Sequence, residues 1–96
     1  MSIKNRDLLS VIIPAYNEEQ YLPQTLSSLI SSIKHCKEIK EYEIIVADNL
    51  STDKTAEIAT KYGAKVVTEI EHQISKVRNI GAKNAEGKNL LFIDAD

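Results

Sequence analysis

The chain has 96 residues, a net charge of −2 at neutral pH, 43% apolar residues and 27% charged residues. These values are ordinary for one small globular domain, and the lack of a basic excess argues against a nucleic-acid partner. The apolar runs are too short for a transmembrane segment, and no signal-peptide pattern opens the chain. Because the single Cys36 cannot form an internal disulfide, we expect a cytoplasmic protein.

The first part of the chain predicts a strand followed by a helix. Residues 1–7 are polar, and we expect them to form a flexible lead-in. Residues 8–13 are apolar on both faces except for one serine, which is typical of a parallel strand covered by helices on both sides. Pro14 is expected to end this strand, because proline offers no ladder donor. After a polar loop, in which Asn17 is a candidate N-cap, apolar residues recur at helical spacing over residues 21–34.

The middle of the chain repeats this alternation. Residues 43–47 predict a second buried strand, which ends at Asp48 and Asn49. The next turn carries hydroxyl and carboxyl side chains that suit the start of a helix, and we expect that helix over residues 53–62. Residues 64–68 predict a short third strand.

The third helix is expected after a polar loop over residues 69–73, in which His72 is expected to face solvent. One helical face carries apolar and small residues from Ile74 onward, and Gly87 is expected to close the helix. Gly81 costs about 1 kcal/mol relative to alanine inside a helix. We therefore expect a close approach of this helix to the sheet or to a ligand at Gly81.

The last strand is expected at residues 89–93. Strands that alternate with helices through short loops predict an α/β fold, with a three-layer, Rossmann-like parallel sheet of about four strands and three helices. In such sheets, ligands bind outside the carboxyl ends of the strands. Polar residues follow three of the predicted strands at that edge: Tyr16, Asn17, Glu18, Asp48, Asn49, Asp94 and Asp96. The architecture therefore predicts a binding site there.

Four segments resemble the successive blocks of the family 2 glycosyltransferases: VIIPAYNEEQYL, EIIVADNLSTDKTAEIA, ISKVRNIGAKNAEGK and LLFIDAD. They occur in the family's order and spacing, and the resemblance covers residues 8–96. It implies the N-terminal, nucleotide-sugar-binding half of a GT-A domain, with strand order 3-2-1-4. It also implies an enzyme that transfers a sugar from a UDP- or GDP-sugar to an acceptor hydroxyl, with Mg²⁺ or Mn²⁺ as cofactor.

The same resemblance implies roles for individual residues. The loop at Tyr16 would contact the nucleobase, Glu18 the base or ribose, and Asp48 the base or its own loop. Arg78 would reach the base or diphosphate, because its planar fork suits phosphate oxygens. In full, the implied nucleotide-binding residues are Pro14, Ala15, Tyr16, Glu18, Asp48, Asn49, Arg78 and Asp94. Four positions depart from the family pattern: Asn49 stands where a second aspartate is frequent, Leu50 replaces a common glycine, and Gln73 and Lys76 stand where the family often has a glycine and a small residue.

Asp94-Ala95-Asp96 fits the family's DXD motif, and the resemblance implies that Asp94 and Asp96 bind the metal ion. Asp94 would hold the ribose or a metal-bound water, and Asp96 would ligate the cation that bridges the diphosphate. The chemistry agrees, because Mg²⁺ prefers oxygen ligands and takes only one or two protein carboxylates beside phosphate oxygens. Such a cation neutralises the charge that develops on the departing diphosphate.

The general base of this family lies further along the chain than Asp96, so no catalytic residue is assigned. We expect a domain truncated after the DXD motif, which is inactive alone and lacks the acceptor site. An alternative is a non-catalytic α/β binding module or a receiver-like signalling module, because receivers also gather acids at strand ends. Receivers, however, place two acids directly after the first strand, where this chain has Pro14 and Ala15. The implied strand order leaves the last strand at an edge, which favours a homodimer through that edge.

Overall fold

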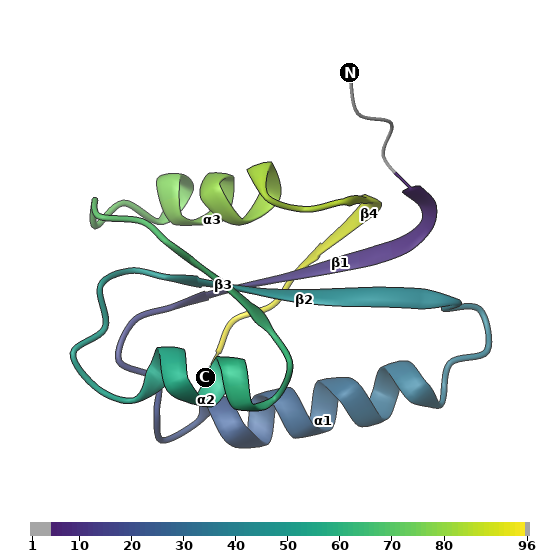
Figure 1. The fold of residues 1–96 in the computed structure, drawn as a ribbon, viewed down its shortest axis with the longest axis horizontal. Coiled ribbons are helices and arrows are strands. Elements are labelled where there is room, and N and C mark those ends of the chain that lie inside the picture. The colour runs from purple at the N-terminus through teal and green to yellow at the C-terminus, as the bar shows by residue number, and fades with distance from the viewer. Residues whose placement is uncertain (1–4, 96) are drawn as a thin grey trace.

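The computed structural model describes residues 5–95, in which four strands alternate with three helices. In chain order they are β1 (Asn5–Ala15), α1 (Leu22–Lys34), β2 (Glu41–Asp48), α2 (Thr55–Lys61), β3 (Lys65–Thr68), α3 (Ile74–Lys83) and β4 (Gly87–Phe92). The strands pair in parallel in the order β3-β2-β1-β4. Figure 1 shows three layers, with α3 on one face of the sheet and α1 and α2 on the other. The predicted fold class and strand order are confirmed.

The strand order also decides against the receiver-like alternative. In the flavodoxin-like order of receiver domains, β1 lies between β2 and β3. In the described part of this chain, β1 instead lies between β2 and β4, and β3 pairs with β2 at one edge. A receiver-like module is therefore wrong for this chain.

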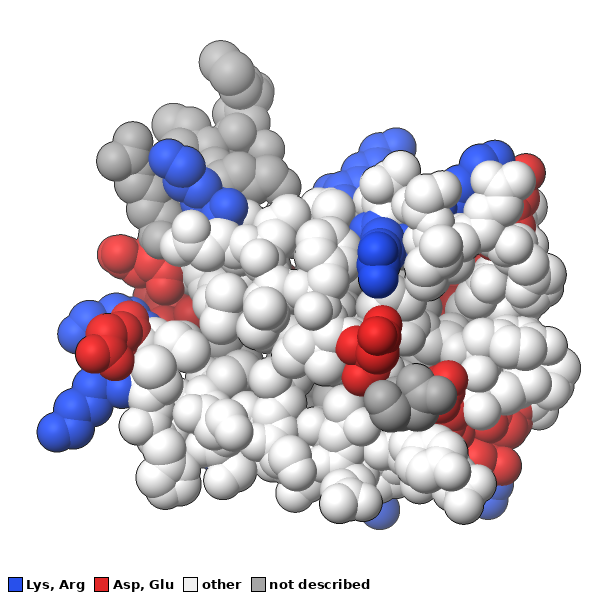
Figure 2. Space-filling model, turned by 180° about the vertical axis from the view of Figure 1, so that it is seen from behind, with Lys and Arg blue, Asp and Glu red and all other residues white. Residues whose placement is uncertain are grey.

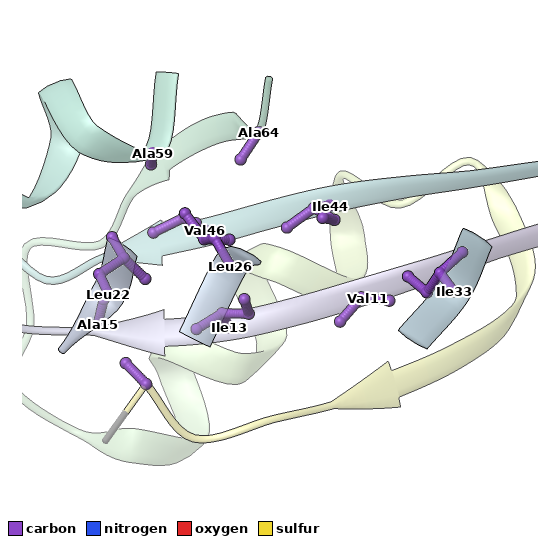
Figure 3. Close-up of a cluster of buried hydrophobic side chains, with 11 residues drawn as sticks. Val11, Ile13, Ala15, Leu22, Leu26, Ile33, Ile44, Val46, Ala59 and Ala64 are labelled. Atoms are coloured by element: carbon purple, nitrogen blue, oxygen red, sulfur yellow. The ribbon is translucent and has the colours of Figure 1, made fainter. Parts of the chain in front are cut away.

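The core lies on both faces of β1 and β2, because successive side chains of a strand point to opposite faces. On one face, Ile12 and Ile45 pack toward α3 together with Ala85. On the other face lies the larger cluster, in which α1 supplies three side chains over the strands (Figure 3). Its labelled members in that view are Val11, Ile13, Ala15, Leu22, Leu26, Ile33, Ile44, Val46, Ala59 and Ala64. Burial on both faces explains the near-continuous apolar runs of these strands.

The close approach expected at Gly81 is confirmed. A Cβ atom added there would lie 2.4 Å from Ile12 Cγ2 and 3.6 Å from Ala47 Cβ. Both contacts belong to the sheet, so Gly81 lets α3 lie directly on β1 and β2. Its cost in helix propensity is therefore offset by helix–sheet packing.

The strand β1 is longer at both ends than predicted. It begins at Asn5, where it pairs with Gly87, so the flexible lead-in is wrong for residues 5–7. Residues 1–4 lie outside the described residues.

At its other end, β1 continues through Pro14 to Ala15, so the prediction that Pro14 ends the strand is wrong. Alternate residues of a strand bond to opposite neighbours, and the Ile12 carbonyl accepts from Ile93 N–H on the β4 side. The missing N–H of Pro14 therefore faces the β4 side, beyond the last residue of β4, and costs no ladder bond.

The prediction that Gly87 closes the third helix is wrong. The helix α3 ends at Lys83 with Asn84 as its C-cap, and Gly87 is the first residue of β4. A Cβ at Gly87 would lie 2.4 Å from the Leu8 carbonyl oxygen, and its N–H donates to Ser10 Oγ at 2.9 Å. Glycine is needed here because the two strand backbones approach closely.

None of the helices in residues 5–95 has the length and apolar character needed to cross a membrane.

Candidate functional site

A cleft of about 290 Å³ opens where the carboxyl ends of β1, β2 and β4 meet the start of α3. Ten residues line it: Pro14, Ala15, Tyr16, Glu18, Asn49, His72, Ile74, Val77, Asp94 and Ala95. Most of the residues predicted to bind a nucleotide are thus brought together, at the edge where parallel sheets bind ligands. Asp48 and Arg78 are not among the lining residues.

The loop after β1 is linked to the loop after β2 through Asn17. Its backbone N–H donates to Ser51 Oγ at 2.9 Å, and its Oδ1 accepts from Thr52 N–H at 2.8 Å. Asn17 has a φ of +52°, a left-handed conformation that asparagine tolerates better than most residues. The expected role of Asn17 as an N-cap is wrong, because α1 has Tyr21 as its N-cap, without a side-chain cap bond. Asn17 instead fixes the shape of the cleft wall.

A second link between these loops positions Glu18. The Glu18 N–H donates to Thr55 Oγ1 at 2.9 Å, and Thr55 is fully buried. Asp53 accepts from the Thr55 hydroxyl, from Thr55 N–H at 2.9 Å and from Glu19 N–H at 3.1 Å. Burial raises the pKa of the Asp53 carboxyl, but the Thr55 and backbone hydrogen bonds outweigh it and leave that pKa below its usual value. Asp53 is therefore held ionised as a structural acceptor.

Asp48 orients the loop after β2 rather than lining the cleft. It is 7% exposed, and its Oδ1 accepts from the Ser51 hydroxyl at 2.5 Å. The Ser51 N–H lies 3.4 Å from the other carboxylate oxygen of Asp48. These bonds span Leu50, which adopts a φ of +60° in the position where a glycine was expected from the resemblance. The turn keeps its left-handed geometry in spite of the leucine side chain.

Asn49 joins three segments at the floor of the cleft. Its backbone N–H donates to the Ala15 carbonyl at 2.9 Å. Its side-chain Nδ2 donates to the carbonyl oxygens of Glu69 at 2.7 Å and Glu71 at 3.1 Å. A carboxylate could not donate either bond, which explains why this chain carries an amide here.

His72 is the lining residue whose role was missed in the sequence. It is exposed, as expected, but its Nδ1 lies 2.9 Å from Asn49 Oδ1. Its ring also meets the ring of Tyr16 edge to face, with centroids 5.3 Å apart at an interplanar angle of 79°. No local pattern signals these contacts, since the two partners lie far from His72 in the sequence.

The helix α3 contributes an apolar wall through Ile74 and Val77. Ile74 is 59% exposed, whereas Val77 is buried at 3%. Arg78 follows Val77 on the same helix and is exposed. On the surface near this wall, Lys76 forms an ion pair with Glu71. The Glu71 carboxylate raises the pKa of Lys76.

The segment after β4 is anchored on both sides of Asp94. The Ile93 N–H donates to the Ile12 carbonyl at 3.0 Å, and the Ala95 carbonyl accepts from Thr25 Oγ1–H at 2.6 Å. Ala95 is 2% exposed, whereas Asp94 is exposed and lines the cleft. Asp96, the second acid of the motif, lies outside the described residues. Asp94 is thereby held at the cleft by the hydrogen bonds of its two neighbours, Ile93 and Ala95.

The cleft offers carboxylate oxygens as ligands for a divalent metal ion. Within residues 5–95, no group of three or more His, Cys, Asp or Glu side chains could enclose a metal. The carboxylates of Glu18 and Asp94 nevertheless line the same cleft. Mg²⁺ at phosphate-binding sites takes only one or two protein carboxylates and completes its shell with phosphate oxygens and water. The residues present fit that open kind of site and not a closed protein cage.

Comparison with known proteins places these features in a family. The family model described as glycosyl transferase family 2 matches residues 10–96. The poly(ribitol-phosphate) β-N-acetylglucosaminyltransferase TarS of Staphylococcus aureus is 40% identical over 93 residues, which cover 91% of this chain and 16% of TarS. A dolichyl-phosphate β-glucosyltransferase of Drosophila melanogaster is 36% identical over 99 residues, covering 92% of this chain and 30% of that protein.

Solved structures agree in fold. The crystal structure of Staphylococcus aureus TarS in complex with UDP gives a TM-score of 0.77 at 38% identity, over 92% of this chain and 27% of that chain. Glucosyl-3-phosphoglycerate synthase from Mycobacterium tuberculosis, in complex with Mn²⁺, UDP and glucosyl-3-phosphoglycerate, gives 0.71 at 30% identity, over 93% and 33% of the two chains. This chain spans between 16% and 30% of the two curated relatives described above. By the family match and the shared fold, the chain belongs to the family 2 glycosyltransferases.

Proposed function

We propose that residues 8–96 form the donor-binding part of an enzyme that transfers a sugar from a UDP- or GDP-sugar to an acceptor hydroxyl. The observation that carries this proposal is the cleft itself, in which Tyr16, Glu18, Asn49 and Asp94 meet at the carboxyl ends of three parallel strands. Two further facts support it. The chain belongs to a glycosyltransferase family, and TarS, a relative with the same fold, has been crystallised with UDP.

The residues that line the cleft suit different parts of a nucleotide. Tyr16 is 49% exposed and, with Ile74, offers apolar and aromatic surface on which a base can pack. We assign the backbone at Pro14 and Ala15 to the same base subsite. Glu18 is assigned to the ribose, because an ionised carboxylate accepts hydrogen bonds from hydroxyls. The roles of Asp48 and Asn49 are to hold the loops that shape this subsite.

The diphosphate is assigned to Asp94, which lines the cleft, and to Arg78, which follows the lining residue Val77 on α3. Arg78 is exposed one residue after Val77 of α3, and a guanidinium matches phosphate oxygens with two parallel donors. Asp94 and, outside the described residues, Asp96 would hold Mg²⁺ or Mn²⁺. When bound, the cation would offset the charge on the departing diphosphate. The synthase from Mycobacterium tuberculosis was crystallised with Mn²⁺ and UDP, which supports this cofactor class.

No catalytic residue of this chain is assigned. Deprotonation of an acceptor hydroxyl needs a base within hydrogen-bond reach of it, and we assign that base and the acceptor pocket to sequence beyond the DXD segment. The small share of its relatives that the chain covers supports this division. Under this proposal the 96-residue chain binds a donor nucleotide and has no sugar-transfer turnover.

Calorimetric titration of the 96-residue chain with UDP and with GDP, each with and without Mg²⁺, tests the proposal. We expect one of the two nucleotides to bind, and Mg²⁺ to strengthen the binding. Asp94→Asn should remove most of the gain from Mg²⁺, at least about tenfold in affinity, because a neutral amide is a poor ligand for a hard cation. Glu57→Gln, an exposed carboxylate in the first turn of α2, is the matched control and should bind like the unmodified chain. Equal Mg²⁺ dependence in the chain and in Asp94→Asn would contradict the assignment.

A further inference from the structure

The side-chain amide of Asn49 has one orientation that satisfies its neighbours. Its Nδ2 atom lies within hydrogen-bond distance of two backbone carbonyls, those of Glu69 at 2.7 Å and Glu71 at 3.1 Å. Carbonyl oxygens only accept hydrogen bonds, so both amide hydrogens are used on them. The opposite assignment would set the amide oxygen against two acceptors, at a residue that is only 8% exposed. The Oδ1 atom of Asn49 is therefore an acceptor.

This orientation determines the tautomer of His72. The His72 Nδ1 atom lies 2.9 Å from Asn49 Oδ1, and two acceptors at this distance would repel each other. Nδ1 therefore carries the hydrogen. In a neutral imidazole only one nitrogen is protonated, so Nε2 holds a lone pair and accepts. Within residues 5–95, the side-chain hydrogen bond of His72 is the one between Nδ1 and Asn49, and Nε2 makes none.

The acceptor lies at a wall of the cleft. His72 lines the cleft beside Tyr16, and the two rings stand at 79° to each other, which makes an aromatic corner. The Nε2 lone pair lies in the plane of the imidazole, so a base that uses it approaches the rim of the His72 ring, beside Tyr16, and not its face. The loop that carries His72 is held in place by the two bonds from Asn49 to its backbone. The acceptor is therefore fixed before any ligand binds, which lowers the entropy cost of using it.

We propose that His72 selects the nucleobase of the donor, by accepting a hydrogen bond at Nε2 from an imino N–H of the base. This inference rests on the proposed function, because it concerns the same cleft. Uracil and guanine each carry an imino N–H on their pairing edge. Cytosine and adenine carry an unprotonated ring nitrogen there, which is an acceptor and faces the Nε2 lone pair without a hydrogen between them. His72 thus makes the cleft a site for uracil or guanine nucleotides and disfavours cytosine and adenine nucleotides.

Nitrogen NMR of the imidazole rings tests the tautomer and its use directly. With its imidazole neutral, His72 is expected to carry its hydrogen on Nδ1 and to show an unprotonated Nε2. Saturation with UDP and Mg²⁺ should shift the Nε2 signal in the direction of an accepted hydrogen bond. His35 is a matched internal control, because its Nδ1 also faces a carbonyl, that of Ser31 at 2.7 Å, on the surface of α1. Its signals should not respond to the nucleotide.

Two substitutions separate base selection from support of the loop. In His72→Asn, the side-chain NH₂ can replace Nδ1–H as the donor to Asn49, but no acceptor remains in the place of Nε2. We expect this variant to fold normally and to lose about tenfold of the preference for UDP over CDP, the size of one good hydrogen bond. His72→Phe removes both the donor to Asn49 and the acceptor and should lose the same preference, while the two bonds from Asn49 to the loop backbone remain.

The outcomes distinguish this inference from the proposed function. If UDP binds and shifts the amide signals of Tyr16 and Asn49, while Nε2 is unchanged and His72→Asn keeps the full preference for UDP over CDP, His72 has only a structural role and the inference is wrong. The proposed function would then stand. If neither UDP nor GDP binds the chain, both the function and the inference are contradicted. An Nε2–H tautomer of His72 in the free chain would overturn the inference by itself.

Discussion

Leu50 shows how a single residue can be held in a backbone conformation that its side chain disfavours. Its φ is +60°, in the left-handed region, where a Cβ costs roughly 1–2 kcal/mol. The flanking residues maintain this geometry, because Asp48 accepts hydrogen bonds from both the backbone and the hydroxyl of Ser51. The leucine side chain gains little in return, since it is 46% exposed. The turn is thus set by the need to position Asp48 and Asn49, not by the preference of Leu50.

Leu50→Gly should therefore stabilise the chain. Removing the strain gains roughly 1–2 kcal/mol, and the greater freedom of glycine in the unfolded chain costs roughly 0.5–1 kcal/mol, so a net gain of about 0.5–1 kcal/mol is expected. Leu50→Ala is the control, because it removes the side chain but keeps the Cβ. It should give no gain. Urea unfolding measures both, and equal free energies of unfolding for the two variants would show that the conformation is not strained.

The residues of the cleft divide into those that local pattern can predict and those that it cannot. Tyr16, Glu18 and Asp94 follow predicted strands, and a parallel sheet places such residues at one edge. The contacts of His72 with Asn49 and Tyr16 depend on the path of the loop after β3, which no periodicity encodes. Likewise, no local pattern decides whether Asp48 orients its own loop, as its bonds to Ser51 show, or contacts the base.

At the scale of elements, hydrophobic periodicity predicted the type and order of all seven described strands and helices. Their ends were less accurate, because tertiary contacts decide them. Pro14 stays in β1 because its neighbour β4 has already ended, and Gly87 opens β4 because the backbone of β1 is close. Neither fact can be seen before the strands are paired.

The packing of α3 on the sheet gives a prediction at this scale. Gly81→Ala would gain about 1 kcal/mol in helix propensity but would place a methyl group against the fully buried Ile12. Overpacking of this kind costs roughly 1–3 kcal/mol, so a net loss of up to about 2 kcal/mol is expected. Asn79→Ala, an exposed position of the same helix, gains propensity without a clash and should be neutral or stabilising. Thermal unfolding in which Gly81→Ala melts higher than the unmodified chain would contradict this packing.

At the scale of the whole molecule, one edge of the sheet is exposed along β4. In the described residues β4 pairs only with β1, and Leu90, Leu91 and Phe92 are each more than 40% exposed. Figure 2 views the molecule from the side on which β4 lies, and a broad area of that face carries no charged side chains. Apart from Lys88 near its start, this edge strand carries no charge, and its last three residues are apolar and exposed, so it is suited to pair with another strand.

We therefore predict that the 96-residue chain self-associates through β4. Leu91→Lys should shift it toward monomer, because a buried lysine at the new interface would lose its hydration. Ile70→Lys is the control, since Ile70 is 70% exposed in the loop after β3, away from this edge. Sedimentation velocity at high micromolar concentration checks the prediction. A monomeric unmodified chain, or an equal effect of both substitutions, would count against pairing through β4.

The central claim is that the cleft at the carboxyl ends of β1, β2 and β4 binds a nucleoside diphosphate. Amide NMR of the chain during titration with UDP and with GDP, in the presence of Mg²⁺, tests it most directly, because it reports position as well as binding. The account predicts that the largest shifts fall on lining residues such as Tyr16, Asn49, Val77 and Ala95. A groove of about 600 Å³ along α1, lined in part by Gln24, Ser28 and Ser32, should stay unchanged. Shifts concentrated along α1, or no shifts with either nucleotide, would contradict the claim.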